Sequence, residues 1–205
     1  MDKTKLALII SLIVVLAVTC IRPVFPSQQY LQHIGTALLM IPLITGLRKN
    51  GMPKGAYIGL AVFTLFHVIG ARYIYSYVPY KEWATAIGLG DSALFQGSRN
   101  HYDRFVHFAF GVLLFPYFRY VCKRYLRQKP LVSVFMAWLV IQTCSMVYEL
   151  FEWTLTICMS PADADSYNGQ QGDMWDAQKD MALALLGSTL MAVICWLRYL
   201  FRKRH

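Results

Sequence analysis

The side chains best suited to chemistry fall in a few short segments of this sequence. Asp103 and His107 are four residues apart, a spacing that places the carboxylate and the imidazole on one face of a helix. Glu149 and Glu152, three residues apart, share a helix face in the same way. Carboxylates and imidazoles serve as general acids and bases and as ligands for divalent metal ions. These four residues therefore indicate a candidate catalytic or metal site.

A third segment, residues 172–180, adds three carboxylates, which line up along one stripe if the segment is helical. The spacings match no specific metal cassette, because neither an HExxH motif nor the ExxH motif of a di-iron bundle is present. A cluster of this composition suits Mg²⁺, Mn²⁺, Fe²⁺ or Zn²⁺. The candidate acid–base residues, which are also the candidate metal ligands, are Asp103, His107, Glu149, Glu152, Asp176 and Asp180.

Basic residues are interleaved with these acids, and arginine is well suited to holding a phosphate. His67 and Arg72 are five residues apart, about 140° around an ideal helix, so they face different neighbours. We expect His67 near the middle of a membrane span, either closing the site from below or hydrogen-bonded as a packing residue. The candidate substrate-binding residues are Arg72, Arg99, Arg104, His67, His101 and Asp173.

Six apolar runs position these residues, and each is long enough to cross a bilayer core of about 30 Å. The composition agrees, since 57% of the residues are hydrophobic and 15% are charged, against roughly 25% charged in soluble proteins. Long unbroken runs exclude a transmembrane barrel. We expect an all-α, polytopic membrane helical bundle forming a single integral membrane domain over residues 1–205. The expected spans are 5–21, 30–47, 56–77, 102–121, 131–158 and 178–198.

Charge alternates between the two ends of these spans. Most lysines and arginines lie in the N-terminal tail, in the loops at 48–54 and 119–129, and in the tail after 198. Ten of the eleven acidic residues fall at the opposite ends. The positive-inside rule therefore predicts six transmembrane helices with both termini in the cytoplasm. The same distribution accounts for the net charge of +9, so we expect the lipid bilayer, and no nucleic acid, as a partner.

Charged groups cost ~2.5–3.5 kcal/mol each at the centre of a span, so they should face inward and satisfy one another. Three hypotheses remain open. The cluster is a structural salt-bridge network in which Arg72 and Arg104 pair with Glu149, Asp103 or Asp180; or it is a metal site; or it combines acid–base groups with arginine phosphate clamps. The six carboxylates exceed the three arginines by three charges, which favours a cation, protons or a basic partner.

The loops at 78–100 and 159–177 are long and rich in aromatic residues and glycine, and we expect them to cap the site. The five cysteines form no CxxC pair. We expect them to be small buried residues, and the sequence leaves open whether Cys20 and Cys158 pair. Pro42 and Pro116 lie inside spans, where a kink is tolerated.

At four segments the chain resembles the YjdF family of bacterial inner-membrane proteins. The matching stretches are residues 67–79, 99–108 and 148–153 and Gln171-Gly-Asp-Met-Trp-Asp-Ala-Gln-Lys-Asp-Met181. The resemblance covers nearly all of the chain beyond the first span. It implies a multi-pass protein of the bacterial inner (cytoplasmic) membrane, and it implies no activity.

A weaker likeness is to VanZ-like membrane proteins, which are linked to glycopeptide-antibiotic tolerance. Asp103-Arg104-Phe105-Val106-His107 is similar to the Asp-Lys-x-x-His of that family, with Arg104 in place of the lysine. A later Glu and Asp echo the rest of its layout, but the Asn that follows the Asp in that family is absent. This likeness implies a role in the cell envelope.

These observations lead to one principal hypothesis for function. The protein carries an outward-facing polar site, formed by spans three to six, that acts on an envelope lipid or lipid-linked phosphate by metal-assisted or acid–base chemistry. The alternatives are a non-enzymatic carrier or binding protein for a small solute or ion, and a purely structural salt-bridge network. A polar path continuing inward past His67 would favour the carrier.

Overall fold

The computed structural model describes residues 2–48, 51–90, 92, 97–158 and 170–204. Throughout these residues the regular secondary structure is helical, which confirms the all-α prediction. The helices in chain order are α1 (Lys3–Thr19), α2 (Pro26–Thr45), α3 (Lys54–Arg72), α4 (Tyr80–Ala86), α5 (Tyr102–Leu113), α6 (Phe115–Arg124), α7 (Pro130–Cys158) and α9 (Asp176–Arg204).

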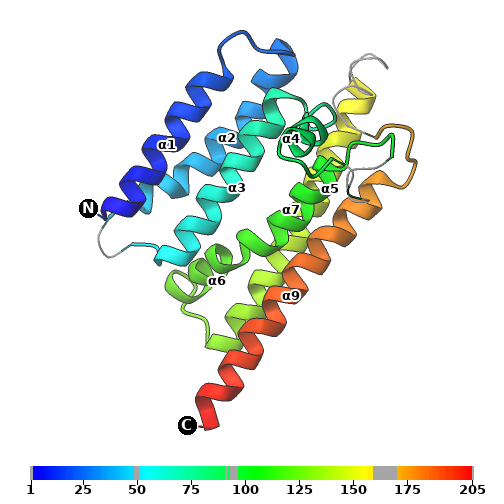
Figure 1. Cartoon of the computed structure of the whole chain (residues 1–205). Helices are drawn as coiled ribbons and strands as arrows, with labels where there is room; N and C mark the ends of the chain where they lie inside the picture. The colour runs from blue at the N-terminus through cyan, green and yellow to red at the C-terminus, as the bar shows by residue number, and fades with distance from the viewer. Residues whose placement is uncertain (1, 49–50, 91, 93–96, 159–169, 205) are drawn as a thin grey trace.

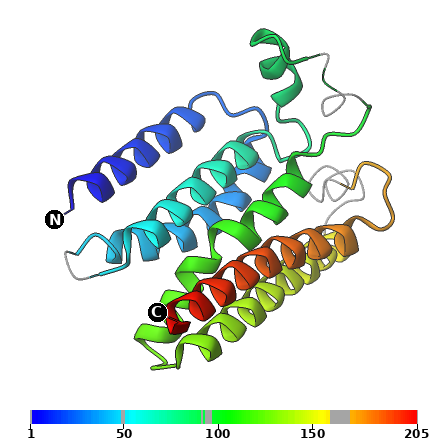
Figure 2. The same cartoon turned by 60° about the horizontal axis from the view of Figure 1, so that its bottom comes forward.

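Helix α3 joins two groups of helices (Figures 1 and 2). Helices α1 and α2 pack on one side of it, while α5 and α6 pack on the other, and α7 and α9 complete the second group. One apolar core lies around Tyr57 and Leu60 of α3, and a second around Phe115, Ile141 and Ala184 joins α6, α7 and α9. The site described below lies where α5, α7 and α9 meet.

Four of the described helical segments are long and apolar enough to cross a membrane: Lys54–Arg72, Tyr102–Arg124, Pro130–Cys158 and Asp176–Lys203. Helix α1 has 17 residues, a length of about 26 Å, which is short for a bilayer core. Helix α2 has 20 residues but begins with polar side chains, including the buried Gln29 and Gln32. Six spans and cytoplasmic termini therefore stay predictions.

The fourth predicted span, residues 102–121, is broken rather than merely kinked. Helix α5 ends at Leu113, and α6 begins at Phe115 with Pro116 in its first turn. Proline has no N–H to donate, and its ring crowds the carbonyl four residues earlier, which accounts for the interruption between α5 and α6. Pro42, in contrast, lies inside α2 without ending it.

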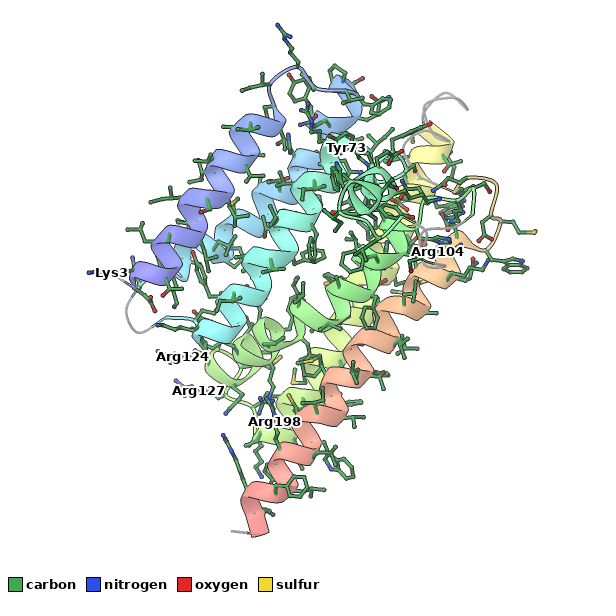
Figure 3. All side chains as sticks on the ribbon, viewed as in Figure 1. Lys3, Tyr73, Arg104, Arg124, Arg127 and Arg198 are labelled. Carbon is green, nitrogen blue, oxygen red and sulfur yellow. The ribbon has the colours of Figure 1, made fainter. Side chains whose placement is uncertain are left out.

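The two ends of the bundle differ in charge. Lys3, Arg124, Arg127 and Arg198 lie toward one end, the basic end, and Arg104 lies toward the other, the site end (Figure 3). Both termini lie toward the basic end (Figure 1), as a chain with an even number of spans requires.

The burial of Lys5 was not predicted from the sequence, and most cysteines are less buried than expected. Lys5, one of the N-terminal lysines whose charge predicts the orientation in the membrane, is buried, and its ammonium donates hydrogen bonds to the carbonyl oxygens of Met52 and Gly46, the latter at 3.0 Å. All five cysteines are free, and the expectation that they are buried holds only for Cys122. Cys20, Cys144 and Cys158 are exposed at the protein surface.

The number of spans can be tested by cysteine labelling in intact cells. In a cysteine-free background, Arg22→Cys lies in the turn between α1 and α2, and Gly51→Cys lies between α2 and α3. If both helices cross the membrane, an impermeant thiol reagent added outside labels position 22 at once and position 51 only after permeabilisation. Labelling of both positions from the same side would contradict six spans.

The contact between α5 and α9 depends on two glycines. A Cβ at Gly111 would overlap the backbone of Ala184 and Ser188, and one at Gly187 would overlap the Phe108 carbonyl. Small residues of this kind allow membrane helices to approach closely. We expect Gly111→Ala to lower the free energy of unfolding by about 1–3 kcal/mol. The added methyl group would meet backbone atoms of α9, which cannot move aside as a flexible side chain can.

The matched control is Gly55→Ala near the start of α3, where an added Cβ meets nothing within 4 Å. That change should be neutral or stabilising by up to about 1 kcal/mol, since alanine is the better helix former. The measurement is the unfolding of both variants in mild detergent. Equal stability of the two would show that the α5–α9 contact is not tight.

Candidate functional site

The start of α5 is fixed by Asn100. Its side-chain oxygen accepts a hydrogen bond from the Tyr102 N–H at 3.0 Å, satisfying one of the free amides of the first turn. Asp103 then lies in the first turn, and His107 lies one turn further in, both buried. The start of α9 is similar, because Asp173 accepts from the Trp175 N–H at 3.1 Å just before the helix begins at Asp176.

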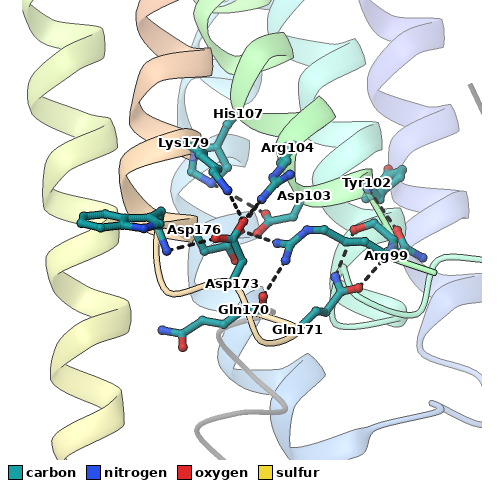
Figure 4. A network of polar contacts seen from close by, with 12 residues as sticks. Arg99, Tyr102, Asp103, Arg104, His107, Gln170, Gln171, Asp173, Asp176 and Lys179 are labelled. Carbon is teal, nitrogen blue, oxygen red and sulfur yellow. Dashed lines mark hydrogen bonds and ion pairs between the residues drawn. The ribbon is translucent and has the colours of Figure 1, made fainter. Parts of the chain in front are cut away.

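An outer ion-pair layer closes the site end of the bundle (Figure 4). It consists of Arg99, Arg104, Asp173, Asp176 and Lys179. Arg99 pairs with Asp176, Arg104 pairs with Asp173 and also lies 3.3 Å from Asp176, and Lys179 donates to Asp173 at 2.6 Å. Both carboxylates of this layer are therefore matched by cations. A salt-bridge network is thus present, but with pairs other than those predicted, because Arg104 pairs with Asp173 and Asp176 rather than with Glu149, Asp103 or Asp180.

Uncharged side chains tie the surrounding loops to this layer. Asn100 and Gln171 form a reciprocal pair, with the Asn100 N–H donating to Gln171 Oε1 at 2.8 Å and Gln171 Nε2 donating to the Asn100 carbonyl at 3.0 Å. The Asn100 amide also donates to the Val78 carbonyl at 2.9 Å. Both residues lie in the motif segments that carry the family resemblance, although their role was not predicted.

The predicted cap is present in part. The segments around residues 76–82 and 97–100 lie beside residues 170–172 and enclose a polar cavity of about 630 Å³. Residues 159–169 of the second predicted cap loop lie outside the described residues.

An inner cluster lies beneath the outer layer and consists of Asp103, His107, Glu149 and Asp180, all buried. His107 Nε2 lies 3.7 Å from Asp103 Oδ1 and 3.5 Å from Glu149 Oε1. Asp103, His107 and Asp180 each offer one ligand atom, and these three atoms all lie within 4.8 Å of one another. Three different helices thus bring an imidazole and three carboxylates to one point.

This inner cluster is not internally satisfied. Glu149 Oε1 and Asp180 Oδ1 are buried and accept no hydrogen bond from any described residue, and the 3.5 Å contact to His107 lacks hydrogen-bond geometry. The two side chains are only 8% and 2% exposed. A buried, unpartnered carboxylate oxygen is costly, so the cluster requires protons or a cation.

Four predicted site residues lie outside both groups. Arg72 donates to the carbonyl oxygens of Thr19 at 2.6 Å and Ile21 at 3.2 Å, so it caps the end of α1 instead of joining the cluster. His101 is largely exposed, and partial desolvation together with the nearby charges of Arg104 and Arg99 lowers its pKa.

Glu152 is half-buried on α7 and hydrogen-bonded to Tyr148. His67 contacts the Gln32 carbonyl at 3.1 Å through Nε2 and the Tyr75 hydroxyl at 2.5 Å through Nδ1. A carbonyl can only accept, so Nε2 carries the proton and Nδ1 accepts from Tyr75. The packing role predicted for His67 thus fits these contacts, with His67 held one helix away from the inner cluster.

One sequence signal distinguishes Glu149 from Glu152. The buried residues of α7 recur every four positions at Ala137, Ile141, Ser145 and Glu149, so Glu149 continues a stripe that packs toward the other helices. Glu152 falls beside this stripe. The small side chains at 137 and 145 could have predicted which glutamate faces inward.

A cavity of about 260 Å³ adjoins the inner cluster. Asp103, His107, His67 and Tyr148 line it toward the site end. Its remaining walls are Gly35, Leu38, Leu39, Phe63, Tyr75, Val106, Phe110, Cys144 and Ser145. Because its walls come from α2, α3, α5 and α7, it lies between the two groups of helices.

Apolar helices of membrane-spanning length, arranged around a buried polar cluster, define a multi-pass membrane protein. The chain belongs to the family of predicted membrane proteins called DUF2238, whose model matches residues 4–200. It is 30% identical over 181 residues to the inner membrane protein YjdF of Escherichia coli strain K12, covering 85% of this chain and 80% of that protein. No solved structure matches the chain.

These comparisons confirm two expectations from the sequence. The resemblance to the YjdF family is correct, and so is the location in the inner membrane. The likeness to VanZ-like proteins stays a prediction.

The outer layer predicts a specific pH dependence. Asp173 lies before α9, and hydrogen bonds from Lys179, the Trp175 N–H and Arg104 hold its pKa well below the ordinary 3.8. A lowered pKa in the folded state stabilises the protein above the unfolded value, and the contribution is lost as the pH falls through the folded pKa. Asp173→Asn should therefore melt at a lower temperature than the wild type at pH 7, with the difference shrinking below about pH 3.8.

Thermal unfolding in detergent across this pH range measures the effect. Glu82→Gln, which changes an exposed carboxylate on α4, is the control and should match the wild type at every pH. A constant difference for Asp173→Asn at all pH values would show that the charge of Asp173 is not what stabilises the layer.

Proposed function

We propose that the protein is a metal-dependent membrane enzyme whose inner cluster binds one divalent ion and acts on a membrane lipid or lipid-linked phosphate. The observation that carries this proposal is the convergence of three ligand atoms, from Asp103, His107 and Asp180, within 4.8 Å of one another. The unpartnered oxygens of Glu149 and Asp180 support it independently, because a metal ion would satisfy them.

The spacing of these atoms suits a metal ion after a small adjustment. Ligand atoms about 2.1 Å from an ion lie roughly 3.3 Å apart in a tetrahedral site, and about 3–4.2 Å apart in an octahedral one. The 3.7 Å and 3.5 Å separations around His107 are already close to this range. Side-chain shifts on the order of 1 Å would bring the set into coordination. One imidazole with carboxylates suits Zn²⁺, Mn²⁺ or Fe²⁺.

Each group has a defined part in this proposal. Such an ion supplies a Lewis acid and lowers the pKa of water. Asp103, His107 and Asp180 would hold it, while Glu149 would serve as a fourth ligand or accept a proton. Arg99 and Arg104 are largely occupied by Asp176 and Asp173. Each retains a buried Nε–H with no partner among the described residues, which could donate to a phosphate.

The carrier hypothesis receives less support from the contacts deeper in the bundle. There, Gln142 donates to the Ser188 hydroxyl at 2.8 Å and the Trp138 indole N–H donates to Thr189 at 3.0 Å. These polar groups pair with each other across α7 and α9. They are thus occupied in joining two helices, rather than available to line a path toward the basic end.

Metal content is the decisive measurement. Protein purified in mild detergent, without chelator or histidine tag, should contain close to one divalent ion per chain. Asp180→Asn and His107→Ala should each weaken metal affinity at least tenfold, because each removes one of only a few ligands and the change in free energy exceeds about 1.4 kcal/mol. Removal of metal from the wild type should also lower its melting temperature.

Asp173→Asn is the matched control, since it removes a carboxylate from the outer layer only. It should keep its metal even where it is less stable. Folded wild-type protein that takes up no Mg²⁺, Mn²⁺, Fe²⁺ or Zn²⁺ when each is supplied would overturn the proposal. Hydrolysis of a lipid phosphate by the metal-loaded protein, lost in Asp103→Asn with folding retained, would establish the enzymatic part.

A further inference from the structure

The cavity beside the inner cluster has one polar end and one apolar end. Asp103 and His107 line it near the site end, whereas Leu39, Phe63 and Phe110 line it deeper in the bundle. The helix directions establish this order, since α5 runs from the site end toward the basic end, and Phe110 comes after His107 along it. The cavity therefore extends from the charged site toward the middle of the membrane.

The rim of this cavity reaches the exposed surface of the bundle. Leu38 of α2 is 64% exposed, and Cys144 of α7 is also exposed. Both residues line the cavity, and Cys144 belongs to a membrane-spanning segment. Helices α2 and α7 each pack on other neighbours and not closely on one another. The opening therefore faces hydrocarbon on the α7 side, and on both sides if α2 crosses the membrane as predicted.

A buried hydroxyl adds an independent sign of a ligand. Ser145 lines the cavity, is only 3% exposed, and its Oγ has no hydrogen-bond partner among the described residues. It lies one helical turn before Glu149 on the buried stripe of α7. A hydroxyl of this kind is costly when nothing contacts it, and it lies where an ester or phosphate oxygen of an occupant would reach.

We propose that this cavity receives one hydrocarbon chain of a membrane phospholipid, which enters sideways between α2 and α7 and brings its phosphate to the inner cluster. A lipid in the leaflet at the site end has its headgroup toward that end and its chains toward the bilayer centre. The polar and apolar ends of the cavity follow the same order. The phosphate contact rests on the proposed function, since the three carboxylates of the cluster would repel an anion unless a metal ion intervened.

Photo-crosslinking in reconstituted vesicles tests the inference. The full chain is placed in phosphatidylcholine vesicles containing phosphatidic acid with a diazirine in one acyl chain, and adducts are mapped by mass spectrometry. A parallel sample contains diacylglycerol with the same diazirine chain. Phosphatidic acid should label the cavity walls on α2, α3, α5 and α7, and this labelling should fall about tenfold when a bulky side chain blocks the opening.

Two variants block the opening from opposite sides, Cys144→Trp on α7 and Leu38→Trp on α2. Both sites are exposed, so neither change disturbs the core, and either one suffices if the other folds poorly. The matched controls are Thr143→Trp and Ile41→Trp, which are exposed on the same helices but do not line the cavity. The controls should label like the wild type.

The outcomes separate this inference from the proposed function, because metal content is measured in the same samples. Labelling spread evenly over lipid-facing residues such as Leu186 and Val193 of α9, and unchanged by the blocking variants, would overturn the inference whatever the metal content. Cavity labelling that is equal for the two probes and insensitive to chelation would overturn the phosphate contact. Cavity labelling by phosphatidic acid that falls to the level of diacylglycerol on chelation would support both proposals.

Discussion

A buried charge must be compensated where it lies, and this constraint organises the site end of the molecule. Two unit charges 4 Å apart interact by about 1 kcal/mol in water and by several times more in the lower dielectric of a protein. Asp173 and Asp176 meet this demand with Arg99, Arg104 and Lys179. The Asn100–Gln171 pair holds the backbone that carries Arg99. The carboxylates of the inner cluster also require compensation, but they lack matching cations. This difference distinguishes the outer ion-pair layer, which is structural, from the inner cluster, which is the candidate site.

The sequence predicted local geometry well because helical spacing is a strong constraint. Asp103 and His107 were expected on one face, and they lie 3.7 Å apart. Five of the six predicted spans coincide with single helices, with starts within four residues and ends within six residues of those predicted, since apolar runs and turn residues mark them directly. Asp176 and Asp180 were expected on one stripe of a helix, and both are buried. Asp176 belongs to the outer ion-pair layer, however, and Asp180 to the inner cluster.

What could not be predicted depends on how the helices pack against one another. The motif around Arg72 suggested a place in the site, but the end of α3 faces α1, and Arg72 satisfies the carbonyls there. The burial of Lys5 was not predicted, because its carbonyl partners, Gly46 and Met52, lie more than forty positions away in the sequence. The cavity beside the inner cluster was not predicted either. It opens between α2 and α7 because these two helices do not pack closely on one another, and the hydrophobic periodicity of neither helix indicates this.

The four residues of the inner cluster come from helices that leave the ribosome at different times. Asp103 and His107 belong to α5, Glu149 to α7 and Asp180 to the last helix of the chain. Synthesis proceeds from the N-terminus, so Asp180 is the last of the four residues to be added to the chain. The tight glycine-mediated contact between α5 and α9 then brings the last carboxylate into place. The inner cluster is thus complete only once α9 is in place, and a chain truncated before α9 lacks both Asp180 and the helix that packs against α5.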